Sequence, residues 1–464
     1  MYELHEECGV FGIYNHKEAS NLTYLGLYAL QHRGQESAGI VAYDGQYMHT
    51  HKGMGHVADV FDEEKLKKLP GSTAIGHVRY STTGDTILKN VQPFVIDYAR
   101  GSLAIAHNGN LVNAHVQRER LEDEGSIFQS TIDTEIIAHL IARSKAEKFE
   151  EALVDALDKV QGAYSLVLLT PKKLVGVRDP FGFRPLILGQ LDGAYVLTSE
   201  SCALSLIEAT YIRDLEPGEI VVIDDQGLRS YKPFAFTREA FCVFEYIYFA
   251  RPDSNFKGEN VAYVRRELGR QLARETGVDA DLVIPIPDSG IYAALGYAEQ
   301  SRIPYEQGLV RNHYVGRTFI EPRQSIRHFG VKVKLNAVRR LIEGKRVIVV
   351  DDSIVRGTTS RKIIKMIRSN GAKEVHMRIS APPSKFPCFY GIDTPTRKEL
   401  IAATHTLDEI SRYLGTDSLG YLSLEGLLGA FKINRGFCTA CFSGDYPIKF
   451  PWKKKRQLRL FEKV

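Results

Sequence analysis

The chain lacks the features that mark membrane, secreted and nucleic-acid-binding proteins. No run of 18 or more apolar residues occurs among its 464 residues, so no segment is predicted to span a membrane. The start, MYELHEE, is acidic and has no apolar core, so we do not expect a signal peptide. The net charge is only +4, which gives no general case for nucleic-acid binding. We therefore expect a soluble cytoplasmic protein with neither a membrane nor a nucleic acid as partner.

Repeats and low-complexity tracts are also missing, and cysteine is scarce, at six residues. A chain of this length predicts two or three domains and does not need disulfides, so metal binding or catalysis is the better expectation for most cysteines. Up to about residue 235, grouped helices and closely spaced strands predict an α+β half with helices over antiparallel sheet. From Glu259 onward, single helices and apolar strands alternate, which predicts an α/β half with a parallel sheet. The aromatic-rich segment 231–254 is predicted to pack between the two.

The string VIVVDDSIVRGTTS, at 347–360, is the strongest local signal. Four apolar residues, Val347–Val350, predict a buried parallel strand, and Asp351 and Asp352 follow at its carboxyl end. The loop Ser353–Ser360 and the helix after it offer N–H and hydroxyl groups to a phosphate, and the carboxylates suit a sugar diol or Mg²⁺. No Gly-Lys-Ser/Thr follows, which excludes a Walker loop. By spacing alone, an ordinary strand–turn–helix fits equally well.

Two further segments of this half carry charge or a loop suited to anions. IPIPDSG, at 284–290, ends with Ser289 and Gly290, whose N–H groups can face a pyrophosphate, although in isolation a simple βα turn is the better interpretation. Between Arg311 and Arg340 there are eight Lys or Arg residues and one Glu, which favours an anionic substrate there. The tail 452–464 has six basic residues and one acidic residue; a solvated end is favoured over RNA or membrane contact.

Cys8 precedes an apolar strand, where a lone cysteine is usually a small core residue. Four other segments change that interpretation: HRGQESAGI (32–40), GHVRYSTTGD (76–85), AHNGNL (106–111) and STIDTEIIAHLI (130–141). Together with Cys8 they resemble the glutamine amidotransferases whose nucleophile is an amino-terminal cysteine.

That resemblance implies a role for each matching residue, and the roles are physically reasonable. Removal of the seven residues before Cys8 would free an α-amine that titrates near pH 7.7–8.0 and can serve as base for the thiol. Asn108 and the Gly109 N–H, in a predicted tight turn, would stabilise the oxyanion. Arg79 would bind the glutamine carboxylate and Asp133 its ammonium, although Asp133 also suits a helix cap. The resemblance implies only supporting roles for Arg33, His77 and Tyr80.

The carboxyl half resembles the phosphoribosyltransferases that use phosphoribosyl pyrophosphate. The resemblance implies that the substrate contacts are Asp288, Ser289, Gly290, Asp351, Asp352, Ser353, Arg356, Gly357, Thr358 and Thr359. It implies that Mg²⁺ is held by Ser289, Asp351 and Asp352. The segment RNHYVGRTFI, at 311–320, resembles the flexible loop that closes over the substrate and excludes water.

Both halves in this order resemble the amidophosphoribosyltransferase family, from Cys8 to about Pro447. The implied fold is a four-layer αββα glutaminase domain of the N-terminal-nucleophile type, joined to a type I phosphoribosyltransferase domain with a central parallel sheet. The implied division is a propeptide (1–7), a glutaminase domain (8–235), a transferase domain (236–447) and a basic tail (448–464).

The implied reaction converts glutamine, water and 5-phosphoribosyl 1-pyrophosphate into 5-phosphoribosylamine, pyrophosphate and glutamate, the first committed step of de novo purine synthesis. Ammonia released at Cys8 would pass to the transferase site. The family also implies a homotetramer and inhibition by purine nucleotides.

Four cysteines need a separate explanation. Cys438 and Cys441 form a CxxC near the end of the chain, Cys242 lies at the domain junction, and Cys388 lies in PCFYGIDTP. Four thiolates suit either tetrahedral Zn²⁺ or a [4Fe–4S] cluster, and the spacing does not choose between them. The resemblance implies the cluster, because the cluster-bearing branch of the family has these motifs together with a short propeptide. Cys202 is expected to be a packing residue.

Other functions are less well supported by the sequence. A sugar-phosphate aminotransferase or an asparagine synthetase would share the Cys8 half but not VIVVDDSIVRGTTS. A non-catalytic sensor of phosphoribosyl pyrophosphate would not need the glutaminase residues, and measured glutamine hydrolysis would exclude it. A glutaminase that has lost transfer would fail to release pyrophosphate when supplied with ammonia.

Overall fold

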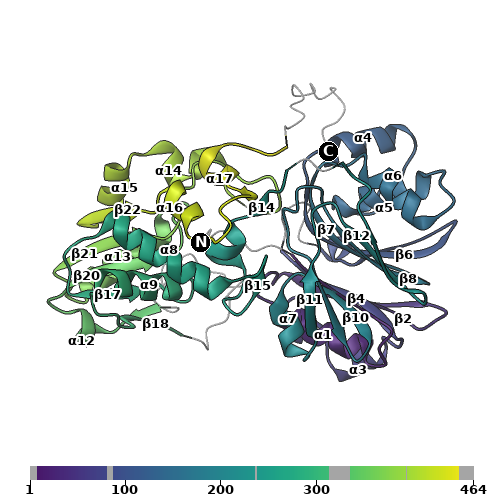
Figure 1. The fold of residues 1–464 in the computed structure, drawn as a ribbon, viewed down its shortest axis with the longest axis horizontal. Coiled ribbons are helices and arrows are strands. Elements are labelled where there is room, and N and C mark those ends of the chain that lie inside the picture. Colours follow the sequence, from purple (N-terminus) through teal and green to yellow (C-terminus); the bar gives the residue numbers. More distant parts are fainter. Residues whose placement is uncertain (1–7, 81–86, 236–237, 313–334, 393, 449–464) are drawn as a thin grey trace.

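The computed structural model describes most of the chain as two halves that lie side by side (Figure 1). The described residues are 8–80, 87–235, 238–312, 335–392 and 394–448. The predicted propeptide, most of the predicted substrate loop and nearly all of the basic tail lie outside them. All the predicted site residues lie inside.

The amino-terminal half contains two antiparallel sheets. The first has the order β11 (Thr210–Asp214), β9 (Ile187–Leu191), β10 (Ala194–Thr198), β1 (Gly9–Tyr14), β4 (Thr73–Arg79), β2 (Ser37–Tyr43) and β3 (Met48–Met54). The second has the order β13 (Gly227–Tyr231), β12 (Ile220–Asp224), β8 (Lys173–Arg178), β7 (Gly162–Thr170), β6 (Gly101–Leu111) and β5 (Phe94–Tyr98). Alternate apolar residues of the two sheets, such as Val10, Ile75 and Val167, form one buried cluster. The sheets therefore pack face to face.

Helices cover the outer face of each sheet. The helices α1 (Ala19–Ala29) and α7 (Ser201–Leu206) pack on the first sheet, next to the short helices α2 (Val57–Val60) and α3 (Glu63–Lys67). The helices α4 (Ala114–Asp123), α5 (Thr134–Arg143) and α6 (Phe149–Leu157) pack on the second. The resulting order, helix–sheet–sheet–helix, confirms the four-layer prediction.

The carboxyl half is built on a four-stranded parallel sheet. Its order is β17 (Leu282–Pro285), β20 (Arg346–Asp351), β21 (Glu374–Ile379) and β22 (Ser418–Tyr421). One face packs against α8 (Val261–Thr276) and α9 (Ile291–Ser301), the other against α13 (Thr358–Ser369) and α15 (Leu407–Leu414). Because helices cover both faces, Val347–Val350 is completely buried, as the unbroken apolar run predicts.

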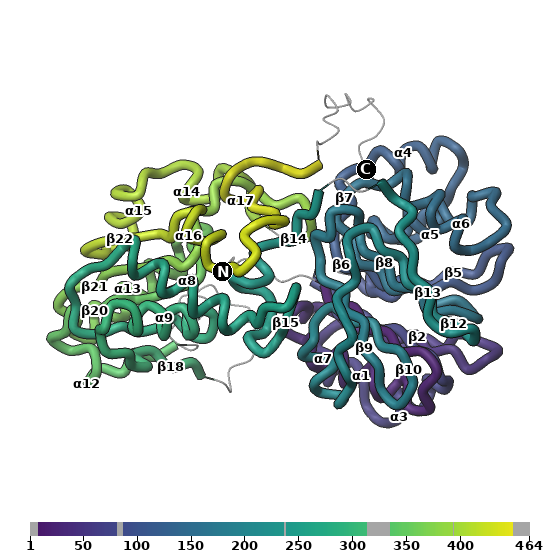
Figure 2. The backbone as a smooth tube through the Cα atoms, in the orientation of Figure 1, coloured from purple at the N-terminus to yellow at the C-terminus, as the bar shows by residue number. Residues whose placement is uncertain are grey.

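The two halves meet at an aromatic junction. There β14 (Phe241–Cys242) pairs in parallel with β23 (Phe437–Cys438), so a late segment of the described chain returns to the domain boundary (Figure 2). A π-helix, η2 (Glu245–Phe249), follows β14 and is buried almost throughout. The junction segment is thus packed between the halves, as predicted, in the residues that the structure describes.

The remaining elements are short. They are η1 (Leu88–Asn90), β15 (Asn255–Phe256), β16 (Glu259–Asn260), β18 (Leu309–Arg311), β19 (Leu335–Ala337), α12 (Arg339–Ile342), η3 (Arg397–Glu399), α14 (Ile401–Thr404), α16 (Leu424–Gly429) and α17 (Ala440–Ser443). None of the helices in the described residues is long and apolar enough to cross a membrane.

Candidate active sites and cysteine cluster

Cys8 lies at the amino end of β1, between β4 and β10, and is 6% exposed. Its thiol donates to the Tyr80 carbonyl at 3.5 Å. Burial raises the pKa of the Cys8 thiol to about 11, and the nearby charges of Arg79 and Asp133 act on it in opposite directions. The structure therefore brings the predicted nucleophile together with both predicted glutamine-binding residues. At neutral pH this thiol needs a base to become nucleophilic.

Asn108 is buried on β6, and within the described residues neither its Nδ2 nor its Oδ1 has a hydrogen-bond partner. Unpaired buried amides are rare and point to an absent ligand or a catalytic task. Gly109 follows at φ +147°, and a Cβ there would meet the Ala163 carbonyl oxygen at 2.0 Å, so the position requires glycine. The predicted tight turn at these residues is wrong: they lie within a strand, and the left-handed glycine supplies the local distortion.

Asp133 is tied to the same strand. Its Oδ2 accepts from the Leu111 N–H at 2.8 Å, and its Oδ1 lies 3.5 Å from His107 Nδ1. Burial opposes its ionisation, but His107 and the Leu111 N–H outweigh burial and hold the pKa of Asp133 below its usual value. Asp133 is the N-cap residue of α5, but its side chain makes no capping hydrogen bond. Its carboxylate instead contacts Leu111 and His107 at the predicted site.

At the carboxyl edge of the parallel sheet, Asp351 and Asp352 are 8% and 5% exposed. The Asp352 N–H donates to Asp351 Oδ1 at 3.0 Å, and the hydroxyls of Ser289 and Ser353 both bond to Asp352. Burial raises the pKa of Asp352. The three residues expected to hold Mg²⁺ are thus neighbours, although Ser289 follows β17 while Asp351 and Asp352 lie at the end of β20.

The loop after β20 is shorter than predicted. Gly357, at φ +75°, ends it, and α13 begins at Thr358, so Thr358 and Thr359 lie in the first helical turn. Their N–H groups are among those that a helix leaves unpaired, which suits a phosphate. Arg356 is bound by Glu399 at 2.6 Å, and Asp288 forms an ion pair with Arg311. The Gly290 N–H donates to the Ile286 carbonyl and is therefore engaged in the βα turn.

The four predicted cluster cysteines gather at the domain junction. Cys242 and Cys438 are register partners across β14 and β23. Cys388 acts electrostatically on both, and all three act on Cys441. Burial raises the pKa of Cys242 to about 11 and raises those of Cys438 and Cys441 as well. Within the described ranges, no three His, Cys, Asp or Glu side chains form a ready-made metal-ion site. Cys202 packs separately on α7.

A network of buried charges between the two sites was not predicted. Its members are Arg33, Arg184, Glu200, Glu245 and Arg265. Only Arg33 lay in a recognised motif. A usable signal was present, because Glu245 is the one acidic residue in the apolar run FCVFEYIYF, and a carboxylate in such a run must be paired.

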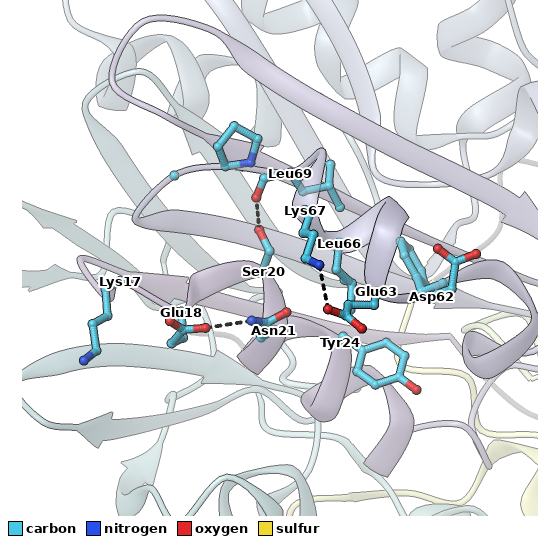
Figure 3. Close-up of a pocket in the computed structure, with 13 residues that line it drawn as sticks. Lys17, Glu18, Ser20, Asn21, Tyr24, Asp62, Glu63, Leu66, Lys67 and Leu69 are labelled. Atoms are coloured by element: carbon cyan, nitrogen blue, oxygen red, sulfur yellow. Dashed lines mark hydrogen bonds and ion pairs between the residues drawn. The ribbon is translucent and has the colours of Figure 1, made fainter.

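A cavity of about 460 Å³ lies away from all of these residues, between α1 and α3 (Figure 3). It contains no predicted site residue. Two pairs of its lining side chains bond to each other, Lys67 to Glu63 and Asn21 to Glu18. It therefore gives no support for a third site.

Comparison with known proteins supports the assignment of the two halves. Residues 77–206 match the family model of the glutamine amidotransferase domain. The chain is 56% identical to amidophosphoribosyltransferase 1, chloroplastic, of Arabidopsis thaliana, over 96% of this chain and 79% of that one. It is 52% identical to the amidophosphoribosyltransferase of Bacillus subtilis, over 96% and 95%.

Two solved structures superpose on nearly the whole chain. One is described as the allosteric regulatory enzyme of purine biosynthesis, with a TM-score of 0.91 and 52% identity over 96% of this chain and 97% of that one. The other is the Bacillus subtilis glutamine phosphoribosylpyrophosphate amidotransferase complexed with ADP and GMP, also at 0.91, with 51% identity over 96% and 98%.

The fold and the sites define a glutamine amidotransferase joined to a phosphoribosyltransferase. The chain belongs to the amidophosphoribosyltransferase family. It is an enzyme that forms 5-phosphoribosylamine, pyrophosphate and glutamate from phosphoribosyl pyrophosphate, glutamine and water, the first committed step of purine synthesis.

Proposed function

We propose that Cys8 is the nucleophile that releases ammonia from glutamine. The observation that carries this proposal is the buried amide of Asn108, which has no hydrogen-bond partner among the described residues and lies on the strand that also binds Asp133. That amide has a hydrogen-bond donor to spare for an oxyanion, and the Gly109 N–H is its proposed partner. Arg79 holds the glutamine carboxylate, and Asp133, ionised at neutral pH, holds the ammonium.

The base is the α-amine of Cys8 after removal of residues 1–7. In the described residues, the Cys8 thiol donates only to a carbonyl, which cannot take its proton. A freed amine titrates near neutrality, so it can accept the thiol proton on attack and return it to the leaving ammonia. Cys8 thus attacks the amide carbon, ammonia leaves, and water releases glutamate from the thioester.

At the transferase site, Asp351 and Asp352 bind the ribose hydroxyls, and the loops around Ser289 and Thr358 bind the phosphates. Mg²⁺ would be held by Ser289, Asp351 and Asp352; few protein ligands are expected, because Mg²⁺ keeps waters and substrate phosphates in its shell. Bound Mg²⁺ would neutralise charge on the departing pyrophosphate. Ammonia from Cys8 then attacks carbon 1 of the ribose as pyrophosphate leaves.

The four cysteines, Cys242, Cys388, Cys438 and Cys441, would carry a [4Fe–4S] cluster with a structural role. Support comes from the donor set: four free thiols at the junction, from β14, β23, α17 and one loop, with Cys242 and Cys438 as register partners. Iron would offset the burial that disfavours thiolates there. Such a cluster would fasten the chain end to the junction.

We also propose that the glutaminase domain spans 8–235, that the transferase domain spans 236–447, and that the enzyme is a cytoplasmic homotetramer. A relative has been solved in complex with ADP and GMP, and this binding of purine nucleotides supports the proposal that they inhibit this enzyme.

The test uses the double variant Asp351→Asn, Asp352→Asn, assayed for both half-reactions. Pyrophosphate release should fall by orders of magnitude with either glutamine or ammonia, while basal glutamine hydrolysis continues in the other half. The matched control is Asp279→Asn, Asp281→Asn: these carboxylates bind Arg346 at the opposite end of β20, at 2.5 and 2.8 Å, and their loss should spare transfer. Normal ammonia-dependent transfer in the first variant would refute the site.

A further inference from the structure

The edge of β6 that carries the proposed oxyanion donors has no strand beside it in the described part of the chain. β5 begins at Phe94, opposite Ile105, so β6 continues from His107 to Leu111 with only β7 as a partner strand among the described residues. In an antiparallel strand, the backbone groups of alternate residues face the same edge. Residues 105, 107, 109 and 111 therefore share the open edge, and Gly109 is one of them.

The hydrogen bonds of the neighbouring residues agree with this direction. On β7, Tyr164 lies opposite Gly109, yet its N–H and its carbonyl both bond to Asp179, at 3.3 and 2.9 Å. Because Tyr164 turns its backbone groups away from β6, the pair that it forms with Gly109 is one without shared hydrogen bonds. Two residues further along β6, the Leu111 N–H donates to Asp133. The Gly109 N–H thus faces the side on which the proposed glutamine ligand Asp133 lies.

At His107, two buried side chains take the place of the missing strand. His77 Nε2, on β4, donates to the His107 carbonyl at 3.0 Å, and the His107 N–H donates to Gln92 Oε1 at 2.8 Å. A carbonyl oxygen only accepts, so the proton of this imidazole is on Nε2. His77 is completely buried and Gln92 is 4% exposed. Both backbone groups of the residue directly before Asn108 are therefore fixed by side chains.

The chemistry of His77 favours a positioning task over an acid–base task. Burial lowers the pKa of His77 to about 3, so the ring is neutral near pH 7 and is a weak base. Its Nδ1 has no hydrogen-bond partner among the described residues, as is also true of the Asn108 amide. Buried polar groups without a partner are rare and call for a functional reason. An apolar side chain would avoid the unpaired Nδ1, but it could not donate to the His107 carbonyl.

We propose that His77 and Gln92 are positioning residues for the oxyanion hole. By fixing His107, they set the direction of the Asn108 amide and the Gly109 N–H toward the tetrahedral intermediate. The proposal rests on the function proposed above, because it requires Asn108 and Gly109 to bind the oxyanion. Such donors act by being fixed in place before charge develops on the oxygen. Loss of either positioning residue therefore lowers kcat and leaves the KM for glutamine nearly unchanged, since the groups that bind the carboxylate and ammonium of glutamine remain.

The first test replaces His77 with Leu, which removes the donor, and with Gln, which can still donate to the same carbonyl. Misplacement of a catalytic group by about 1 Å can cost about 10²-fold in rate, so we expect the kcat of glutamine hydrolysis to fall by about 10–100-fold in His77→Leu. His77→Gln should recover part of that loss. His51→Leu is the matched control, because His51 Nε2 also bonds a backbone carbonyl, that of Val60 at 3.2 Å, on the edge strand β3; its hydrolysis should equal that of the wild type.

Alkylation of Cys8 by iodoacetamide separates a misplaced oxyanion hole from general damage to the site. The thiolate attacks the methylene carbon and iodide leaves, so no oxyanion forms in this reaction. The mass of the peptide that contains Cys8 reports the rate. We expect the same rate in the wild type, His77→Leu and Gln92→Leu, although Gln92→Leu should lose kcat as His77→Leu does. Gln92→Leu also serves if His77→Leu folds poorly.

Asn108→Ala, assayed in parallel, distinguishes failure of this proposal from failure of the proposed function. Normal hydrolysis in Asn108→Ala would contradict the proposed function itself. Loss of hydrolysis in Asn108→Ala, together with a wild-type kcat in either His77→Leu or Gln92→Leu, would overturn the positioning role alone. An alkylation rate that falls in proportion to kcat, or a His77→Gln variant no more active than His77→Leu, would overturn it as well.

Discussion

Replacing Asn108 with Ala should lower glutamine hydrolysis without lowering the stability of the fold. Loss of one oxyanion donor lowers kcat by about 10²–10³, or about 2.7–4 kcal/mol of transition-state stabilisation. An unpaired buried amide costs the folded state about 1–3 kcal/mol, and its removal relieves that cost. The small cavity left behind costs about 1 kcal/mol. We therefore expect Asn108→Ala to be as stable as the wild type, or more stable, while glutamine hydrolysis nearly disappears.

The matched control is Asn110→Ala, two residues along the same strand. Asn110 Nδ2 donates to the Phe389 carbonyl at 2.9 Å, so its removal breaks a formed hydrogen bond and should lower stability by about 0.5–1.5 kcal/mol. Glutamine hydrolysis should be largely kept. The assays are glutamate release at saturating glutamine and thermal unfolding of both variants. If Asn108→Ala keeps its kcat, or unfolds more easily than Asn110→Ala, the oxyanion assignment is wrong.

Two further predictions concern the other cysteines and the propeptide. Cys441→Ser should lose iron and acid-labile sulfide and unfold more easily, whereas Cys202→Ser should keep both; zinc without iron in anaerobically purified wild type would contradict the cluster. A chain that retains residues 1–7 should hydrolyse glutamine very slowly, because a thiol with a pKa of about 11 is ionised in only about one molecule in 10⁴ at pH 7. Its rate should rise about tenfold per pH unit as the thiolate fraction grows. Full activity near neutrality, in a chain whose mass confirms that residues 1–7 are present, would show that no free α-amine is needed.

Helices and strands were predictable wherever the burial of each face of the element alone determines its pattern of apolar residues. Val347–Val350 is covered on both faces, so an unbroken apolar run and the strand β20 agree. The amphipathic helices α5 and α6 both pack on the outer face of the second sheet, and the helical spacing of their apolar residues indicates this one-sided packing. The order of the two halves and the packed junction followed from the same patterns.

The failures occurred where tertiary packing overrides local signals. HNGN has the composition of a turn, yet it pairs with β7 as part of an eleven-residue strand. Asp133 stands where a helix cap belongs, but the Leu111 N–H, distant in sequence, takes its carboxylate. The contacts of Glu245 with Arg33 and Arg184 depend on how the halves dock, which no local pattern reports. The assignment of Cys388 and the CxxC to one [4Fe–4S] cluster came from the family resemblance. The cysteine spacing alone does not distinguish such a cluster from a zinc site.

The central claim is that one chain makes ammonia at Cys8 and uses it at a separate site. Cys8→Ser, assayed for 5-phosphoribosylamine with glutamine and then with ammonium, tests it most directly. Serine keeps the size of the side chain but is a far weaker nucleophile at this pH. We expect synthesis from glutamine to be lost while synthesis from ammonia equals that of the wild type. Synthesis from glutamine at the wild-type rate, or loss of both activities in a folded variant, would contradict it.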